Sequence, residues 1–139
     1  MARIRNLREN AGMDIFRIFH LQCARRLPAL PDTHPCSRLH GHSFRIELTV
    51  SGEVDPALGW VLDFADIEAA WRPVYTLLDH RYLNELEPFT EINPTAENIA
   101  AYFYRELVQT LNNERVRVSS VTLWETDRAC VRYAEEVAP

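Results

Sequence analysis

The sequence predicts an α+β domain in which two strands, two helices and two further strands follow one another along 139 residues. Two segments near the start of the chain alternate apolar and polar residues in the two-residue period of a strand, and two more do so near its end. Between them, two segments repeat apolar residues at helical spacing behind helix start signals. This order predicts a four-stranded antiparallel sheet with two helices on one face.

The first two strands are expected at residues 14–25 and 42–52. The connection between them, residues 27–41, carries three prolines and Gly41, which are too many breakers for the inside of an element. We expect a surface loop there, and Cys36 lies in it. One face of the second strand is apolar and carries Phe44, Ile46, Leu48 and Val50.

Two helices and a hairpin complete the pattern. Asp63 can cap a helix over residues 63–78, and Thr95 can cap a second helix that runs to about residue 112. Strand-like alternation then returns on both sides of a short turn at Asp127-Arg128, which predicts a closing hairpin over residues 115–136.

Composition bounds what the chain can be. At 139 residues and 47% hydrophobic, it is expected to form a single domain over residues 1–139, with residues 1–12 as a loose arm. A net charge of −5 without a basic stripe argues against a nucleic-acid partner, and no stretch is apolar enough for a membrane or a signal peptide. Three cysteines are therefore expected as free thiols in a cytoplasmic protein. All fifteen cations are arginines, which excludes a Schiff-base lysine.

His40 and His42 are the first candidate for chemistry. They lie two residues apart at the start of the second strand, so both side chains point to one face. Two imidazoles placed in this way can bind one Zn²⁺, although a lone His-x-His pattern is weak and either ring can equally be a hydrogen-bonded structural residue. Cys36, four residues before His40, strengthens the interpretation.

An acid–imidazole pair and a further acid are the other candidates. Asp79 and His80 end the first predicted helix, where the carboxylate can orient the imidazole as a general acid or base; alone, the pair more simply predicts a polar helix end. Glu125 follows Trp124 on the opposite face of its strand. It is either partly buried with a partner or simply at a strand end, and a buried carboxylate can hold a guanidine-like edge in a bidentate manner.

These pieces together resemble the 6-pyruvoyltetrahydropterin synthase family, most closely its bacterial 6-carboxytetrahydropterin synthase branch of queuosine biosynthesis. The spacing of Cys36 to the HGH triplet is what resembles the bacterial branch. The resemblance spans most of residues 22–126 and rests on the segments RRLPALPDTHPCSRLHGHSF, GEVDPALGWVLDFADIEAA, LDHRYLN, NPTAEN and WET.

The resemblance implies a tunnelling fold (T-fold), in which sheets of several subunits join into a barrel, with active sites between subunits of a homohexamer. It implies a lyase that converts 7,8-dihydroneopterin triphosphate to 6-carboxy-5,6,7,8-tetrahydropterin, acetaldehyde and triphosphate. By this resemblance Cys36 is the proton-abstracting base, Asp79 and His80 return a proton, and Glu125 anchors the pterin. His40 and His42 are zinc ligands, and Thr95 lines the pterin pocket or only caps its helix.

One position departs from the family pattern. A third metal-ligand histidine is expected just before Arg-Leu-Pro, and this chain has Arg25 there. Either Cys23, on the same strand face, replaces it as a zinc ligand, or Arg25 supplies fixed positive charge and the metal is weakly bound or lost. Cys23 is equally well explained as a small core residue.

The departure leaves two competing functions beside the synthase. One is a pterin enzyme with altered chemistry, of the 6-pyruvoyltetrahydropterin or sepiapterin type. The other is a non-catalytic pterin-binding protein, suggested only by Arg25. The presence of all four residues expected to act on the substrate argues against the second; they are Cys36, Asp79, His80 and Glu125.

Overall fold

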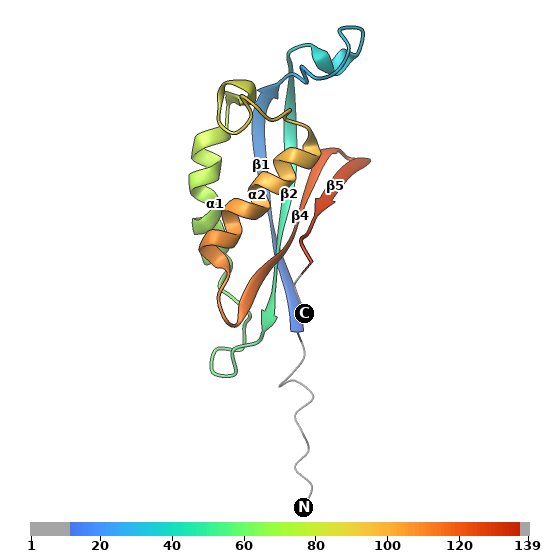
Figure 1. Ribbon diagram of the computed structural model, residues 1–139. Coiled ribbons are helices and arrows are strands. Elements are labelled where there is room, and N and C mark those ends of the chain that lie inside the picture. Colours follow the sequence, from blue (N-terminus) through green and yellow to red (C-terminus); the bar gives the residue numbers. More distant parts are fainter. Residues whose placement is uncertain (1–11, 137–139) are drawn as a thin grey trace, which may run out of the picture.

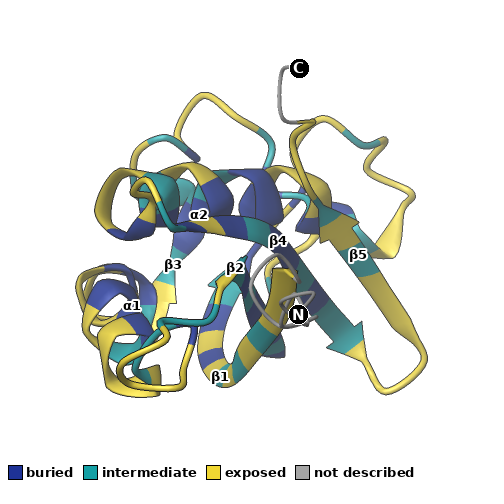
Figure 2. Cartoon of the chain, turned by 90° about the horizontal axis from the view of Figure 1, so that it is seen from below, coloured by how far each residue is buried: buried dark blue, intermediate teal, exposed yellow. Residues whose placement is uncertain are grey.

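Two helices cover one face of a five-stranded sheet in the computed structural model, which describes residues 12–136 (Figure 1). The elements are β1 (Gly12–Arg25), β2 (His40–Glu53), α1 (Phe64–Leu78), β3 (Arg81–Tyr82), α2 (Ala96–Leu111), β4 (Val116–Thr126) and β5 (Ala129–Tyr133), with short 3₁₀ helices at Pro35–Ser37 and Leu83–Glu85. The strand order in the sheet is β3-β1-β2-β4-β5. Buried residues lie between the helices and the sheet (Figure 2).

β1 and β2 form a long antiparallel pair that is longer than predicted. Their register runs from Gly12 opposite Glu53 to Arg25 opposite His40. His40 and Gly41, which we expected in the loop, therefore belong to β2, because pairing with the end of β1 extends the ladder. The predicted loose arm at residues 1–12 lies outside the described residues except for Gly12, which begins β1.

β3 corrects the predicted four-stranded antiparallel sheet. This two-residue strand pairs with Cys23 and Ala24 of β1 in parallel, so the sheet is mixed. The His80 N–H also donates to the Gln22 carbonyl at 2.6 Å, which attaches the chain to the edge of β1 directly after α1. Two residues are too short to show a strand period, so the sequence pattern could not reveal this strand.

The predicted helices and their start signals are confirmed. The Asp63 carboxylate accepts a hydrogen bond from the Ala65 N–H at 2.9 Å at the start of α1, and the Thr95 hydroxyl accepts one from the Asn98 N–H at 3.2 Å at the start of α2. Each bond satisfies an amide that has no partner inside the helix. No helix within residues 12–136 is long and apolar enough to cross a membrane.

Two irregularities in β4 control which side chains face the helices. The pairing with β2 shifts by one residue between Thr49 and Val50, so that Val118 and Val121 are both buried although they are three positions apart. A second shift, in the pairing with β5, falls at Glu125 between Trp124 and Thr126. Bulges of this kind re-aim a side chain, and the second one is part of the site described next.

Candidate active site

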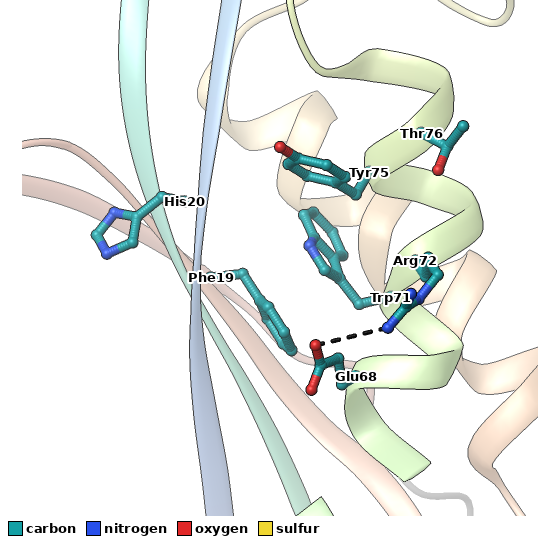
Figure 3. Close-up of a pocket in the computed structure, with 7 residues that line it drawn as sticks. All are labelled: Phe19, His20, Glu68, Trp71, Arg72, Tyr75 and Thr76. Carbon is teal, nitrogen blue, oxygen red and sulfur yellow. Dashed lines mark ion pairs between the residues drawn. The ribbon is translucent and has the colours of Figure 1, made fainter. Parts of the chain in front are cut away.

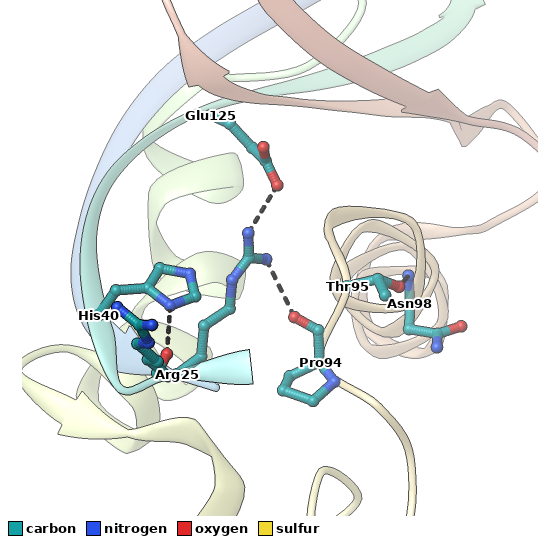
Figure 4. A network of polar contacts seen from close by, with 7 residues as sticks. Arg25, His40, Pro94, Thr95, Asn98 and Glu125 are labelled. Atoms are coloured by element: carbon teal, nitrogen blue, oxygen red, sulfur yellow. Dashed lines mark hydrogen bonds and ion pairs between the residues drawn. The ribbon is translucent and has the colours of Figure 1, made fainter. Parts of the chain in front are cut away.

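The candidate site lies at the end of the sheet where β1 stops and β2 begins. Pairing between β2 and β4 ends at Arg45 and Trp124, so the first residues of β2 have only β1 as a neighbour in the sheet. Four side chains lie close together near that point, the predicted residues His40, His42 and Glu125 and, with them, Arg25. Figure 4 shows His40 beside the Arg25 side chain, which extends toward Glu125 and Pro94.

The two histidines lie together and have free nitrogens. Their ring centroids are 4.8 Å apart in an edge-to-face arrangement, and the His42 ring stacks on Phe44 at 4.7 Å. His40 Nδ1 donates to the Arg38 carbonyl at 2.7 Å, which leaves its Nε2 with a lone pair in the neutral ring. The Nε2 atoms of both rings are buried without a hydrogen-bond partner within the described part of the chain.

The surroundings of His42 keep its ring neutral. Burial lowers the pKa of His42 to about 4, helped by the positive charges of Arg25 and His40 and opposed by Glu125. At neutral pH the ring is therefore uncharged and can accept a proton or bind a ligand through a lone pair.

Arg25 is the centre of the polar network in Figure 4. Its side chain is only 2% exposed, and Nη2 contacts Glu125 Oε1 at 2.6 Å while Nη1 donates to the Pro94 carbonyl at 2.9 Å. The guanidinium carbon lies 5.3 Å from the centroid of the Phe44 ring. The face predicted for Glu125, opposite Trp124, is thus confirmed, but its partner was not predicted because the two residues are 100 positions apart.

A metal ion fits this donor set only in part. The two unpartnered imidazole nitrogens suit Zn²⁺, but a guanidinium keeps its protons and offers no lone pair. Among residues 12–136, no three His, Cys, Asp or Glu side chains are grouped so that they could hold a metal. Cys23 is buried, and burial together with the Asp79 charge, opposed by Arg25, raises the pKa of its thiol to about 12. The residues present therefore do not fit a three-ligand zinc site.

The Asp79–His80 pair is fixed to β1. The His80 Nδ1 contacts Asp79 Oδ2 at 2.6 Å, and Asp79 Oδ1 accepts from the Gln22 N–H at 3.0 Å. Burial alone raises the pKa of Asp79, but hydrogen bonds from the Gln22 N–H, His80 and Tyr75 outweigh it and hold the pKa below its usual range. His80 has a φ of 57°, a left-handed conformation that a non-glycine residue rarely adopts.

One member of each pair, His80 and His42, lines a common cavity. His80 is 76% exposed and borders a cavity of about 470 Å³ together with His42, Cys23, Gly41 and Tyr82. An imidazole whose Nδ1 is held by a carboxylate presents its Nε2 to this cavity as a proton carrier. The role of Gln22 in holding Asp79 could not be found from the sequence because it acts through strand proximity, whereas Tyr75 lies four residues before Asp79, a helical spacing that could have indicated it.

Of the two remaining predicted residues, the structure brings Thr95 to the Arg25 network, whereas Cys36 lies in the β1–β2 loop and does not line the cavity that His42 and His80 share. The Cys36 N–H donates to His34 Nδ1 at 3.0 Å, and the Cys36 carbonyl accepts from the Leu27 N–H at 2.8 Å. The thiol is free and half-buried, and no hydrogen bond within residues 12–136 joins it to Asp79 or the histidines. Thr95 follows Pro94, whose carbonyl binds Arg25, so the start of α2 lies against the network.

A second hollow lies away from these residues. It has a volume of about 420 Å³ and opens between β1 and α1 (Figure 3). Phe19 and Trp71 stack there with ring centroids 5.4 Å apart, and Glu68 pairs with Arg72 at 3.6 Å. None of the residues predicted to carry chemistry lines this hollow.

An α+β domain in which two histidines with buried, unpartnered nitrogens lie near an acid–imidazole pair and a cavity has the features of a protein with a small-molecule site. Residues 14–136 match the family described as 6-pyruvoyl tetrahydropterin synthase, and this chain belongs to that family. The solved 6-pyruvoyl tetrahydropterin synthase of Caenorhabditis elegans superposes with a TM-score of 0.82 at 28% identity, covering 91% of this chain and 97% of that one. The predicted family and T-fold class are confirmed.

Two relatives by sequence carry different names. A protein of Archaeoglobus fulgidus, provisionally named 6-carboxy-5,6,7,8-tetrahydropterin synthase, is 39% identical over 92 residues, which cover 66% of this chain and 76% of that protein. The dihydroneopterin monophosphate aldolase of Pyrococcus furiosus is 37% identical over 87 residues, or 63% of this chain and 70% of that protein. Similarity of this degree assigns the family without selecting one reaction within it.

Proposed function

We propose that this chain is a cytoplasmic lyase that converts 7,8-dihydroneopterin triphosphate and water to 6-carboxy-5,6,7,8-tetrahydropterin, acetaldehyde and triphosphate, as a step of queuosine (7-deazaguanine) biosynthesis. The observation that carries the proposal is the Asp79–His80 pair, in which Asp79 is held on β1 and His80 borders the same cavity as His42. The name of the Archaeoglobus relative and the Cys36 spacing favour this reaction within the family. Three free thiols agree with a reducing compartment.

The proposed roles follow from the chemistry of each group. The Cys36 thiolate removes a proton from the substrate carbon, and the His80 imidazole, oriented by Asp79, delivers a proton to the substrate. The Glu125 carboxylate binds the amino-pyrimidine edge of the pterin, with Thr95 beside it. The zinc ion expected from the resemblance is not used in any step, because the donor set lacks its third ligand.

A homo-oligomer, expected to be a hexamer, completes the proposal. The outer edge of β1 is paired only at Cys23 and Ala24 within the described residues, which leaves a long strand edge open. Phe16 and Ile18 of the same strand are exposed apolar side chains. Open edges and exposed apolar residues favour association with another chain. Light scattering after size exclusion tests this, and a monomer at micromolar concentration contradicts it.

Pterin binding without turnover is the second candidate function. It is favoured by the Arg25–Glu125 contact, because a guanidinium already occupies the carboxylate expected to hold the pterin. A pterin ligand would then have to share Glu125 or displace Arg25.

One assay separates these functions. The purified protein is incubated with 7,8-dihydroneopterin triphosphate while acetaldehyde, triphosphate and the pterin product are followed, with Cys36→Ser and His80→Gln as matched controls. Acetaldehyde formation that both controls abolish supports the proposal. Triphosphate release with a pyruvoyl product indicates the 6-pyruvoyltetrahydropterin reaction, and cleavage of the monophosphate alone indicates the aldolase reaction. Binding without any product identifies the non-catalytic alternative.

A further inference from the structure

Arg25, a cation, occupies the position where a third metal ligand beside His40 and His42 is expected. Arg25 lies directly opposite His40 in the β1–β2 register, and Cys23 lies directly opposite His42. Side chains at directly opposite positions of an antiparallel pair lie side by side on one face of the sheet. Arg25 and Cys23 are therefore the two β1 side chains beside the pair; Cys23 belongs to the buried core, and Arg25 brings a permanent positive charge.

Arg25 is held in this place by three kinds of contact. Its two terminal nitrogens contact Glu125 Oε1 at 2.6 Å and the Pro94 carbonyl at 2.9 Å, and its guanidinium lies over the Phe44 ring. The Arg25 side chain is 2% exposed, so the guanidinium can reach solvent only by breaking these contacts. A metal ion that entered beside His40 and His42 would meet a guanidinium that can neither ligate it nor move away at low cost.

The unpartnered atoms around Arg25 nevertheless indicate a ligand. Arg25 Nε, His40 Nε2 and His42 Nε2 are all buried without a hydrogen-bond partner in residues 12–136. Arg25 Nε is always a donor, whereas in the neutral ring His40 Nε2 is an acceptor, because the ring proton is on Nδ1, which donates a hydrogen bond to the Arg38 carbonyl. Buried polar atoms are expensive to leave unpaired, so a group with oxygen atoms that both donate and accept would satisfy them.

We propose that Arg25 replaces a divalent metal at this site, and that its guanidinium and the two imidazoles bind an oxygen-bearing group of the ligand, a hydroxyl or an oxyanion, without zinc. The identity of the ligand rests on the proposed function, but the absence of a tight metal site does not. Arg25 then contributes the fixed positive charge that holds the ligand oxygen, while Glu125 keeps the guanidinium in place.

Zinc titration tests the proposal without any need for turnover. The wild-type chain and the variants Arg25→His, Arg25→Lys and Arg25→Met are freed of metal, and zinc affinity is measured by competition with a chromophoric chelator. Because loss of one supporting partner of a metal ligand already costs about 10- to 100-fold in affinity, we expect Arg25→His to bind one zinc per chain at least about 100-fold more tightly than wild type. Cobalt absorption should report a tetrahedral site in that variant alone.

The matched variants separate charge from ligation. Arg25→Lys keeps the charge and should bind zinc as weakly as wild type, and Arg25→Met removes the charge without adding a ligand and should remain well below Arg25→His. Adding His40→Ala to Arg25→His should abolish the gain. Arg25→His/Glu125→Gln is measured as well, since it removes the carboxylate charge that the single variant leaves unpaired.

Two results would overturn the proposal. One is a wild-type chain that binds a full equivalent of zinc as tightly as Arg25→His; the other is an Arg25→His protein that folds and gains no affinity. Activity is a separate readout: wild-type turnover should survive a strong chelator that inhibits Arg25→His. If no protein turns over the pterin substrate, the proposed function fails while the zinc titration still decides the role of Arg25.

Discussion

The Arg25 guanidinium and the Glu125 carboxylate are in contact at 2.6 Å, and their exposures are very unequal. The arginine side chain is 2% exposed and the glutamate side chain is 33% exposed. Removing one partner of a buried ion pair is costly because the other charge is left without compensation. The two single replacements should therefore have different costs, although they break the same contact.

Glu125→Ala should destabilise the fold more than Arg25→Met. The first leaves a fully buried guanidinium with the Pro94 carbonyl as its one hydrogen-bond partner in residues 12–136, at a cost of about 3 kcal/mol, whereas the second leaves a carboxylate that water reaches, at about 1 kcal/mol. Urea unfolding at one fixed chain concentration measures both, since an oligomer makes stability depend on concentration. Equal costs would show that the glutamate is as well shielded as the arginine.

His42 should make stability depend on pH between about 4 and 6.5. Burial lowers the pKa of His42 from 6.5 to about 4 in the folded chain, so the unfolded chain binds more protons inside that window. The free energy of unfolding is therefore highest above pH 6.5 and falls by about 1–2 kcal/mol as the pH falls toward 4. This figure allows for the solvent around a half-buried ring.

Urea unfolding from pH 7 to pH 4 in the presence of a chelator measures this effect. His42→Gln should flatten the pH dependence, and His20→Gln, which removes an exposed histidine of β1, is the matched control. A wild-type slope that His42→Gln leaves unchanged would assign the effect to other groups.

The three cysteines should react in an order set by burial and pKa. Cys23 is 6% exposed, and burial is the main cause that raises its pKa to about 12, so its thiolate is scarce at pH 8. Cys130 is exposed and Cys36 is half-buried. Timed iodoacetamide labelling with peptide mass analysis should modify Cys130 and Cys36 in the native protein, and Cys23 only after unfolding. Labelling of Cys23 at the rate of Cys36 would contradict the buried thiol.

Thr95 should affect both stability and pterin binding. Thr95→Ala removes the hydrogen bond to the Asn98 N–H and should cost about 1 kcal/mol of stability, which Thr95→Ser should largely restore. If Thr95 also contacts the pterin, Thr95→Ala raises KM as well. Asp63→Ala removes the equivalent cap of α1, away from the site, and should lower stability without changing KM. If Thr95→Ala and Asp63→Ala change KM equally, Thr95 acts only as a helix cap and does not bind the pterin.

Periodicity was sufficient to predict the strands and helices because each is long enough to repeat its pattern several times. The burial of every second residue from Phe44 to Val50 and the helix starts at Asp63 and Thr95 follow from local rules. The two-residue β3 and the register shift at Glu125 depend on neighbours in the sheet, so no local pattern encodes them. The sequence indicated that Arg25 departs from the family pattern, but only the fold brings it to Glu125.

Asp79→Asn should preserve the fold while reversing the proton arrangement of His80. The side-chain carbonyl of the new amide can still accept from the Gln22 N–H, but its NH₂ group would donate toward His80 Nδ1, which must then accept. The proton moves to Nε2, the atom proposed to exchange protons with the substrate.

Nitrogen chemical shifts of the His80 ring should report that change of tautomer directly. Since a positioned acid or base contributes about 10²- to 10⁴-fold, kcat should fall by that order with little change in KM. Asp55→Asn, which alters a carboxylate that binds turn amides remote from the cavity, is the matched control. An Asp79→Asn protein with altered nitrogen shifts and unchanged kcat would remove His80 from the proton transfer, because the imidazole would then have lost the carboxylate that stabilises its protonated, proton-donating form without consequence.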